Sequence, residues 1–408
     1  TNYFKKAAER AEQNYANQEA LNLYLKAVEE IEKTANGTYS KEWCGFLQKA
    51  GSIYSLLGKT DDALLALEKA LSNLDSKDSI QKAQIMRQKG LAYNAARNFP
   101  KMIENYQQAA QELGKWDESK DQNWIDEWIN LQLDLAWAFY FGNRVSELDE
   151  TIQLIQPIIE MSGSLEQKNR LYGTICLSDF RKFRYYQLPD FTMNRLSLQL
   201  ETALQTGNQV LIGRALAKTG FARMWRNEHD LAEKAFQESF PYIEHVGDMD
   251  SLLISKSYIA LTMRKKGDLT KTMAYAENAL ELAKFLQSHY YIGVSYSILG
   301  WAHWKLGDPE KAKQLLNYAI EAYQKFPGTN PIEFLYKGPL LGMAVEEENW
   351  KKAVELSQSL LDPIQQRMPD QAYELIRKGM VMCKESDLNS TKATFSELIL
   401  LLRKEQTG

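Results

Sequence analysis

Cysteine and histidine are scarce in this chain of 408 residues, which contains three cysteines and four scattered histidines. Cys44, Cys176 and Cys383 lie far apart, and their odd number fits neither a disulfide framework nor the close spacing of metal ligands. No His-Glu-x-x-His motif occurs, and no histidine has a second ligand at metal-site spacing. These absences predict a protein without a metal ion or other cofactor, in a reducing, cytoplasmic setting.

The chain also lacks a strong charge of either sign and any long apolar run. Lysine and arginine number 49 against 53 aspartates and glutamates, a formal net charge of -4, so no cationic field is available to attract phosphates. The longest apolar run, Leu398 to Leu402, is far below the ~18 residues that a membrane helix needs, and no signal-peptide pattern is recognisable. We therefore expect neither nucleic acid nor a membrane as a partner.

Proline and glycine, the residues that interrupt helices, are few as well. Only ten prolines and 22 glycines are present, while residue types that favour helices dominate. Apolar residues recur at steps of three and four over residues 63–74 and 274–286, as on amphipathic helices. No alternating strand pattern bounded by hairpin turns occurs. The fold class is therefore predicted to be all-α.

What the chain does contain is an internal repeat. A segment beginning at Gly51 recurs, with its small residues at identical offsets, in a segment beginning at Gly300, and further copies begin at Gly90 and Gly220, among others. Ten copies, 38 to 46 residues apart, cover essentially the whole chain, the fourth, fifth and tenth being inferred mainly from spacing. The fifth fits worst, since Arg181 stands where a small residue belongs.

This pattern resembles the tetratricopeptide repeat, a hairpin of two antiparallel helices. The unit of that family is nominally ~34 residues, so the hairpins of this chain have longer helices or loops. The resemblance implies a right-handed α-solenoid of about ten helix-turn-helix hairpins, which form a single domain over residues 1–408. Two irregular loops, near residues 115–125 and 326–331, interrupt the regular spacing.

Small residues, glycine turns and helix caps mark the predicted hairpins. Gly51 and Ala63 lie where larger side chains would hold the two helices apart. Between the helices, glycines can adopt a positive φ at little cost, and the aspartates that follow them are suited to cap the next helix. The residues predicted to form these turns are Gly58, Gly267, Gly307, Asp61, Asp268 and Asp308, with Pro309 in a first helical turn.

The long period is similar to that of the sensor domains of bacterial signal-transduction NTPases, a group that includes the maltose-regulon activator. Residues 7–21, followed by Tyr24, are similar to the hairpin that begins the repeat array after the ATPase module in such proteins. The resemblance implies a ligand- or protein-binding sensor and assembly scaffold in signal transduction. No phosphate-binding Gly-Lys-Thr or Gly-Lys-Ser loop occurs, and the first residue is Thr1, so we expect a fragment of a larger protein.

Motifs for catalysis are absent from the sequence. There is no Gly-x-Ser-x-Gly segment, no cysteine has an adjacent histidine, and Glu346 to Glu348 are typical of a solvated helix end. We therefore expect that the protein is not an enzyme. Two alternatives to the sensor remain: a cytoplasmic receptor for short peptides, which uses similar long-period arrays, and a repeat-containing enzyme with an unrecognised active site.

The resemblance also implies where a ligand binds, because the first helix of each tetratricopeptide hairpin lines a concave groove. Aromatic and apolar residues at these positions are concentrated in the middle of the array, accompanied by arginines suited to an acidic ligand and asparagines suited to an extended backbone. The predicted groove residues are Arg87, Asn94, Asn130, Trp137, Tyr140, Arg214, Phe221, Met224, Arg264, Trp301 and Trp304.

Two interpretations of these aromatic positions remain open, because side chains that fill the space between long helices share the same spacing. Groove residues would keep accessible surface, whereas core residues would be almost wholly buried. The Lys and Asn pattern by which some tetratricopeptide domains clamp a C-terminal carboxylate is not reproduced, since Gln48, Ser52, Arg87 and Leu91 occupy those positions. The expected partner is a protein or peptide, and the apolar helix around residues 398–402 is expected to support self-association.

Overall fold

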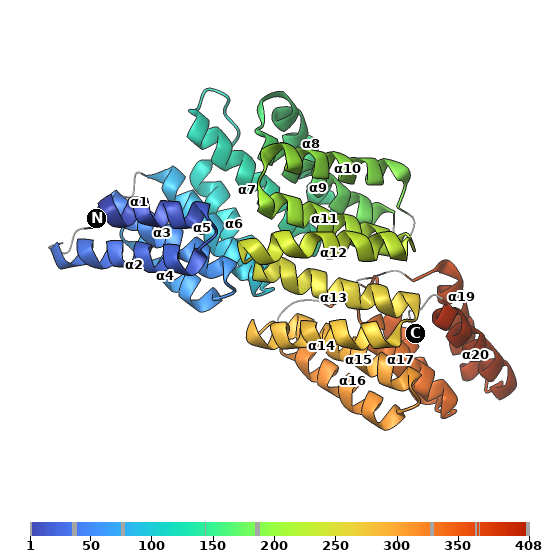
Figure 1. Cartoon of the computed structure of the whole chain (residues 1–408). Coiled ribbons are helices and arrows are strands. Elements are labelled where there is room, and N and C mark those ends of the chain that lie inside the picture. The colour runs from blue at the N-terminus through green and yellow to red at the C-terminus, as the bar shows by residue number, and fades with distance from the viewer. Residues whose placement is uncertain are drawn as a thin grey trace. The chain divides into compact units, whose positions relative to one another are not determined.

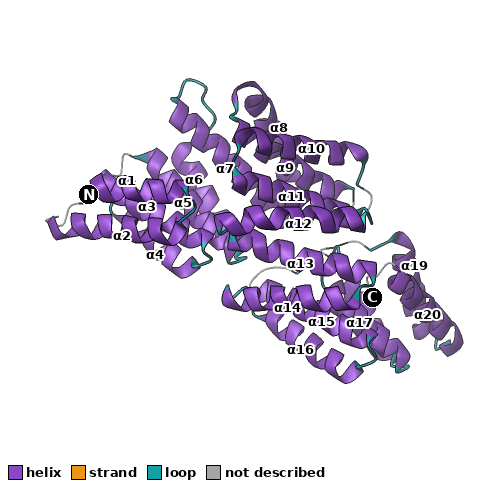
Figure 2. Cartoon of the chain, in the orientation of Figure 1, coloured by secondary structure: helices purple, strands orange, loops and turns teal. Residues whose placement is uncertain are grey.

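The computed structural model describes residues 2–34, 39–74, 78–142, 144–183, 188–326, 330–363, 365–366 and 368–404. These residues form 20 α-helices and no strand, which confirms the all-α fold class (Figures 1 and 2). Contacts divide the chain into unit 1, Thr1–Trp225 and Ala235–Leu252, and unit 2, Arg226–Lys234 and Leu253–Gly408. The helical repeat continues through this division, and the single domain over residues 1–408 stays a prediction.

The helices of unit 1 are labelled in chain order in Figure 1. They are α1 (Asn2–Gln13), α2 (Asn17–Thr34), α3 (Lys41–Leu56), α4 (Thr60–Ser72), α5 (Ser79–Ala95), α6 (Phe99–Leu113), α7 (Gln122–Phe141), α8 (Val145–Ser162), α9 (Leu165–Lys182), α10 (Asp190–Thr206) and α11 (Gln209–Trp225). Both units share α12 (His229–Val246) and α13 (Met249–Lys266). Unit 2 adds α14 (Leu269–Phe285), α15 (His289–Lys305), α16 (Pro309–Gln324), α17 (Phe334–Glu346), α18 (Trp350–Leu360), α19 (Asp370–Lys384) and α20 (Leu388–Lys404).

Consecutive helices pack as hairpins, for example α3 with α4, α5 with α6 and α15 with α16. The predicted small residues lie at the closest approach: a Cβ placed on Gly51 would be 2.6 Å from Leu67, and one on Gly300 would be 2.7 Å from Leu316. The same offset of 16 residues joins Gly379 to Phe395 in the tenth hairpin, where spacing alone predicted a repeat. Glycine at these positions therefore sets the distance between the paired helices.

The turns of the hairpins follow most of the sequence predictions. Gly58, Gly267 and Gly307 have φ values of 74°, 75° and 81°, and the Asp268 and Asp308 side chains cap α14 and α16. The prediction that Asp61 caps the next helix is wrong. Helix α4 begins at Thr60, so the carboxylate lies inside the first turn, where it faces the positive end of the helix dipole.

The fifth repeat, which fitted the pattern worst, still forms a hairpin of α9 and α10. Arg181 replaces the expected small residue, and its guanidinium extends to the preceding repeat. There it donates a hydrogen bond of 3.0 Å to the carbonyl oxygen of Tyr140 and lies 4.6 Å from the centre of that ring. A large residue is tolerated because its side chain leaves the contact between the paired helices.

The two irregular loops both join hairpins. Residues 114–121 link α6 to α7, so the remaining residues of the predicted loop near 115–125 belong to α7. Within the loop, the ring centre of Trp116 lies 4.9 Å from that of Trp128. The second loop lies between α16 and α17, and its residues 327–329 are outside the described part of the chain. In α20, Leu398, Ile399 and Leu402 are buried within the chain, which leaves mainly Leu400 exposed for the predicted self-association.

Within unit 1 the first hairpin contacts the end of the sixth. The side-chain amide of Asn17 donates a hydrogen bond of 2.7 Å to the carbonyl oxygen of Val246, and the Tyr15 ring packs edge-on against His245. Arg97, after α5, forms an ion pair of 2.7 Å with Asp250 at the start of α13. The six hairpins of this unit therefore curve until their ends meet.

No helix in the ranges given above is both long and apolar enough to cross a membrane.

Candidate functional site

The first helices of the hairpins in unit 1 form a continuous layer. Helix α3 contacts α5, α5 contacts α7, α7 contacts α9, and α9 contacts α11, in addition to their hairpin partners. In a curved stack of repeats, the layer whose members touch across successive repeats lies on the shorter, inner side. We call the polar and aromatic residues of this layer the inner face. It consists of Arg87, Asn94, Glu127, Asn130, Asp134, Trp137, Arg170 and Lys218.

Arg87 of α5 is the first cation of the inner face, and it binds two carboxylates of α7. Its Nε and Nη2 atoms donate to Glu127, and its Nη1 atom donates to Asp134 at 2.9 Å. Burial opposes the charge of Arg87, but the two carboxylates outweigh it and raise the pKa of the guanidinium. Burial raises the pKa of Glu127, against the effect of Arg87. These contacts hold α5 and α7 in one register.

Arg170 of α9 continues the network to the next repeat. Its guanidinium forms an ion pair with Asp134, and its Nη1 atom donates a hydrogen bond of 2.8 Å to the side-chain oxygen of Asn130. Asp134 therefore lies between two arginines from different repeats. The bonds join residues 36 to 47 positions apart, which is about one repeat.

Trp137 and Lys218 extend the inner face to α11. The indole Nε1 atom of Trp137 donates a hydrogen bond of 3.3 Å to the side-chain oxygen of Asn94, and Lys218 Nζ lies 5.6 Å from the centre of the indole ring. Lys218 Nζ also donates to the carbonyl oxygen of Gly173 at 3.1 Å. All three side chains are partly exposed, so a ligand can reach them.

The remaining predicted residues of unit 1 lie around this layer. Arg214 is exposed and forms an ion pair of 2.7 Å with the buried Asp248, whose pKa is held below its usual value by Arg214 and Ser251 although burial opposes this. Tyr140 is buried beneath Arg181. Phe221 is partly exposed and its ring centre lies 5.2 Å from that of Phe180.

Three predicted groove residues have no accessible surface. Met224 in unit 1 and Arg264 and Trp301 in unit 2 are 0% exposed, so the expectation that they line an accessible groove is wrong. The Arg264 guanidinium lies 4.8 Å from the Trp301 ring centre and donates to the carbonyl oxygen of Leu335. Trp304 belongs to the same core cluster, and its Nε1 atom donates to Glu346. These side chains lie on the helix faces that pack into the core, and core-facing residues recur at the same spacing along a helix as groove-facing residues do.

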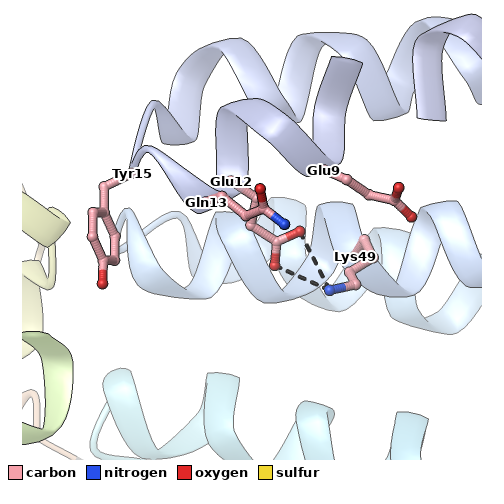
Figure 3. A pocket seen from close by; sticks show the side chains of 5 residues that line it. All are labelled: Glu9, Glu12, Gln13, Tyr15 and Lys49. Atoms are coloured by element: carbon pink, nitrogen blue, oxygen red, sulfur yellow. Dashed lines mark hydrogen bonds and ion pairs between the residues drawn. The ribbon is translucent and has the colours of Figure 1, made fainter. Parts of the chain in front are cut away.

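An open hollow of about 350 Å³ lies between α1 and α3 (Figure 3). Glu9, Glu12, Gln13, Tyr15 and Lys49 line it, and none of them belongs to the predicted groove. Lys49 Nζ donates to both carboxylate oxygens of Glu12, at 3.0 and 3.3 Å, as Figure 3 shows. Because its central charges are paired with each other, the hollow offers less to a ligand than the inner face does.

Sequence reasoning found Arg87, Asn94, Asn130 and Trp137 but missed the residues that complete the inner face. These are Glu127, Asp134, Arg170 and Lys218. Asp134 and Lys218 both precede the small packing residue of their helix by two positions, and both interrupt apolar stretches: Leu-Gln-Leu-Asp-Leu-Ala-Trp and Ala-Leu-Ala-Lys-Thr-Gly-Phe. A single ionisable residue within an apolar stretch is the signal that could have identified them.

Nothing in the described part of the chain resembles a metal centre. No group of three or more His, Cys, Asp or Glu side chains is placed to hold an ion there. The arrangement can supply hydrogen-bond donors, acceptors and charges to a ligand at fixed positions.

Comparisons with known proteins agree with this architecture. Residues 251–325 match the family model of the tetratricopeptide repeat. In fold, the chain is similar to a Rap protein complexed with competence and sporulation factor, with a TM-score of 0.58 and 12% identity, over 100% of this chain and 99% of that one. It is also similar to NprR in complex with its cognate peptide NprX, with a TM-score of 0.52 and 14% identity, over 88% of this chain and 99% of that one.

A third similar structure is a signal-transduction ATPase with numerous domains that has a tetratricopeptide-repeat sensor, from Pyrococcus horikoshii. The TM-score is 0.50 and the identity 13%, over 92% of this chain and 55% of that one. No curated protein matches the sequence. Together with the repeat match, these likenesses confirm a tetratricopeptide-like solenoid.

Proposed function

We propose that this chain is a non-catalytic receptor for a short, extended peptide, which binds to the inner face of unit 1. The observation that carries the proposal is the hydrogen bonding of the side-chain amides of Asn94 and Asn130. The oxygen of each side-chain amide accepts a hydrogen bond, from Trp137 in one case and from Arg170 in the other. Indole and guanidinium groups only donate, so the partner atom in each asparagine must be the oxygen.

The nitrogen of each amide is consequently the end left for a ligand. Within the described residues, the Nδ2 atoms of Asn94 and Asn130 have no hydrogen-bond partner, and both side chains are partly exposed. Two oriented amides from adjacent repeats can donate to carbonyl oxygens of an extended backbone, which recognises a peptide independently of its side chains. The aromatic surface of Trp137, whose indole is hydrogen-bonded to Asn94, supplies an anchor.

The likeness to the Rap and NprR structures supports this choice of ligand. The Rap protein is complexed with competence and sporulation factor and NprR with its cognate peptide NprX, and the likeness covers 99% of each of those chains. A second candidate is a sensor domain within a larger signalling ATPase. The Pyrococcus horikoshii structure supports it, because this chain aligns with only 55% of that protein. The two candidates differ in whether the chain acts alone or within a larger ATPase, and in both the ligand would bind to the same inner face.

The test is selection from a synthetic hexapeptide library by the full chain, followed by calorimetry of the enriched peptides. Asn94→Ala and Asn130→Ala should each weaken binding about three- to tenfold, since each removes one hydrogen bond to the peptide. Gln107→Ala on the exposed side of α6 is the matched control and should bind as the wild type does. Absence of any enriched peptide, or unchanged affinity in the Asn94→Ala/Asn130→Ala double variant, would contradict the proposal.

A further inference from the structure

Lys218 differs from the other cations of the inner face in its charge balance. Arg87 is paired with Glu127 and Asp134, and Arg170 is paired with Asp134. No carboxylate of the described residues lies within ion-pair distance of Lys218 Nζ, whose printed contacts are the carbonyl oxygen of Gly173 and the indole ring of Trp137. An ammonium group has three donors, so Lys218 retains donors for a ligand.

The position of the ammonium is fixed by the helices around it. A Cβ placed on Gly173 of α9 would lie 2.6 Å from Lys218 Nζ and 2.6 Å from the side-chain nitrogen of Gln199, so Nζ occupies space that a side chain would otherwise fill. The same indole that Lys218 faces donates to Asn94. The cation and one of the two proposed peptide-binding amides therefore contact the same aromatic ring.

The charged and titratable groups nearest to Lys218 do not compensate its charge. Burial is the main cause that lowers its pKa, to about 8; Cys176 acts in the opposite direction, and Arg214 and Arg170 lower the pKa further. Burial raises the pKa of the Cys176 thiol to about 12, so this group is neutral at physiological pH. Lys218 remains mostly protonated at pH 7, with a charge that no neighbour balances.

We propose that Lys218 binds a carboxylate group of the peptide ligand, either the C-terminal carboxylate or an Asp or Glu side chain. This inference rests on the proposed peptide-binding function and names the chemistry of the ligand at one position. A carboxylate supplies the missing single negative charge and accepts a charge-assisted hydrogen bond in a partly buried setting, where such bonds are strongest. A phosphate dianion fits less well, since the neighbouring arginines are already paired.

The experiment compares three pools of N-acetylated hexapeptides for binding to the full chain. The first pool has a free C-terminal carboxylate and no Asp or Glu, the second is amidated and has no Asp or Glu, and the third is amidated but contains Asp and Glu. Binding from the first pool identifies the C-terminal carboxylate as the source, and binding from the third identifies a side chain. The second pool should bind at least tenfold more weakly than the better of the other two.

Lys218→Met keeps the length of the side chain and removes its charge. It should lower the affinity for the best carboxylate peptide to that of the second pool, which has no carboxylate. Lys101→Met should leave this affinity unchanged. Lys101 is the matched control because its Nζ also lies over an aromatic ring, 5.4 Å from the centre of Tyr93, but on the exposed side of α6. Wild-type affinity should fall tenfold or more between pH 7 and 9.5 as Lys218 loses its proton, and the affinity of Lys218→Met should not.

The outcomes separate this inference from the proposed function. If the carboxylate-free pool binds as tightly as the others, and Lys218→Met has no effect while the asparagine variants weaken binding, the carboxylate site is refuted and the peptide receptor stands. If no pool binds, both are refuted. Thermal unfolding of each variant shows that the binding comparisons are made between folded proteins.

Discussion

Lys218 is the cation on the inner face whose ionisation the fold opposes. Its ammonium is partly buried without a carboxylate, and the Trp137 ring offsets only part of the lost hydration. We therefore expect Lys218→Met to stabilise the unliganded protein by ~0.5–2 kcal/mol at pH 7, as is common where function requires a strained group. Thermal or urea unfolding measures this difference. Destabilisation by the same substitution would contradict the account of Lys218.

The stabilisation should depend on pH with a defined sign. The pKa of Lys218 is lowered in the folded protein, to about 8 from an ordinary value near 10.5. Below pH 8 the lysine is charged in both states, and the folded state bears the full cost of burying the charge. This cost declines between pH 8 and 10.5 and is absent above. The advantage of Lys218→Met should therefore be largest below pH 8 and disappear as the pH approaches 10.5.

Asp134 carries the opposite role, because it compensates two arginines at once. Asp134→Asn should destabilise the protein by ~1–3 kcal/mol, since Arg87 and Arg170 would lose a charged acceptor in a partly buried network. The control is Glu30→Gln, which removes one half of an exposed pair with Lys33 and should change stability far less, because exposed ion pairs contribute little. Equal effects of the two substitutions in chemical denaturation would show that the Asp134 network stabilises the protein no more than an exposed ion pair does.

At the scale of single residues, the sequence predicts part of the site. Offsets from the small packing residue predicted Asn94, Asn130 and Trp137, which are among the residues of the inner face. The same offsets failed for Met224 and Trp301, because packing and inner stripes share the helical period and only the three-dimensional contacts distinguish them.

At the scale of the helix pair, two glycines of α3 allow a direct test of the repeat. Gly51→Ala should destabilise by ~1–3 kcal/mol because its Cβ would lie 2.6 Å from Leu67. Gly45→Ala in the same helix meets nothing within 4 Å, so it should stabilise by ~0.5–1 kcal/mol through helix propensity. The thermal midpoints of the two variants should move in opposite directions. Stabilisation by both would refute the close contact between α3 and α4.

The turns between helices allow a second test with opposite signs. Gly307 has a φ of 81° and no atom near its missing Cβ, so Gly307→Ala should cost ~1 kcal/mol from backbone strain alone. Gln287 has a φ of 52° and an exposed side chain, so Gln287→Gly should be neutral or stabilise by up to ~1 kcal/mol. Chemical denaturation of the two variants measures both changes.

These turns also explain why the tenth repeat was hard to detect from the sequence. Gly58, Gly267 and Gly307 mark the turn in three other repeats, but Ser386 occupies the equivalent position of the tenth with a φ of 62°. No glycine therefore marks that turn. The all-α fold class was predictable, because apolar residues recur at steps of three and four over residues 63–74 and 274–286.

At the scale of the whole molecule, the chain is expected to bind peptides and to catalyse nothing. Calorimetric titration with Mg-ATP should show no saturable binding, since the sequence has no phosphate-binding loop. The positive control is a titration with the tightest-binding hexapeptide from the selection, which should show saturable binding. Saturable ATP binding that persists at high salt, followed by turnover, would reveal an active site.

The most direct test of the central claim is amide hydrogen exchange with and without the tightest hexapeptide. If the peptide binds to the inner face, exchange should slow most in α5, α7, α9 and α11, whose side chains supply the proposed contacts, and should stay unchanged in α14 and α16. Protection confined to unit 2, or to the hollow between α1 and α3, would contradict the proposed binding face.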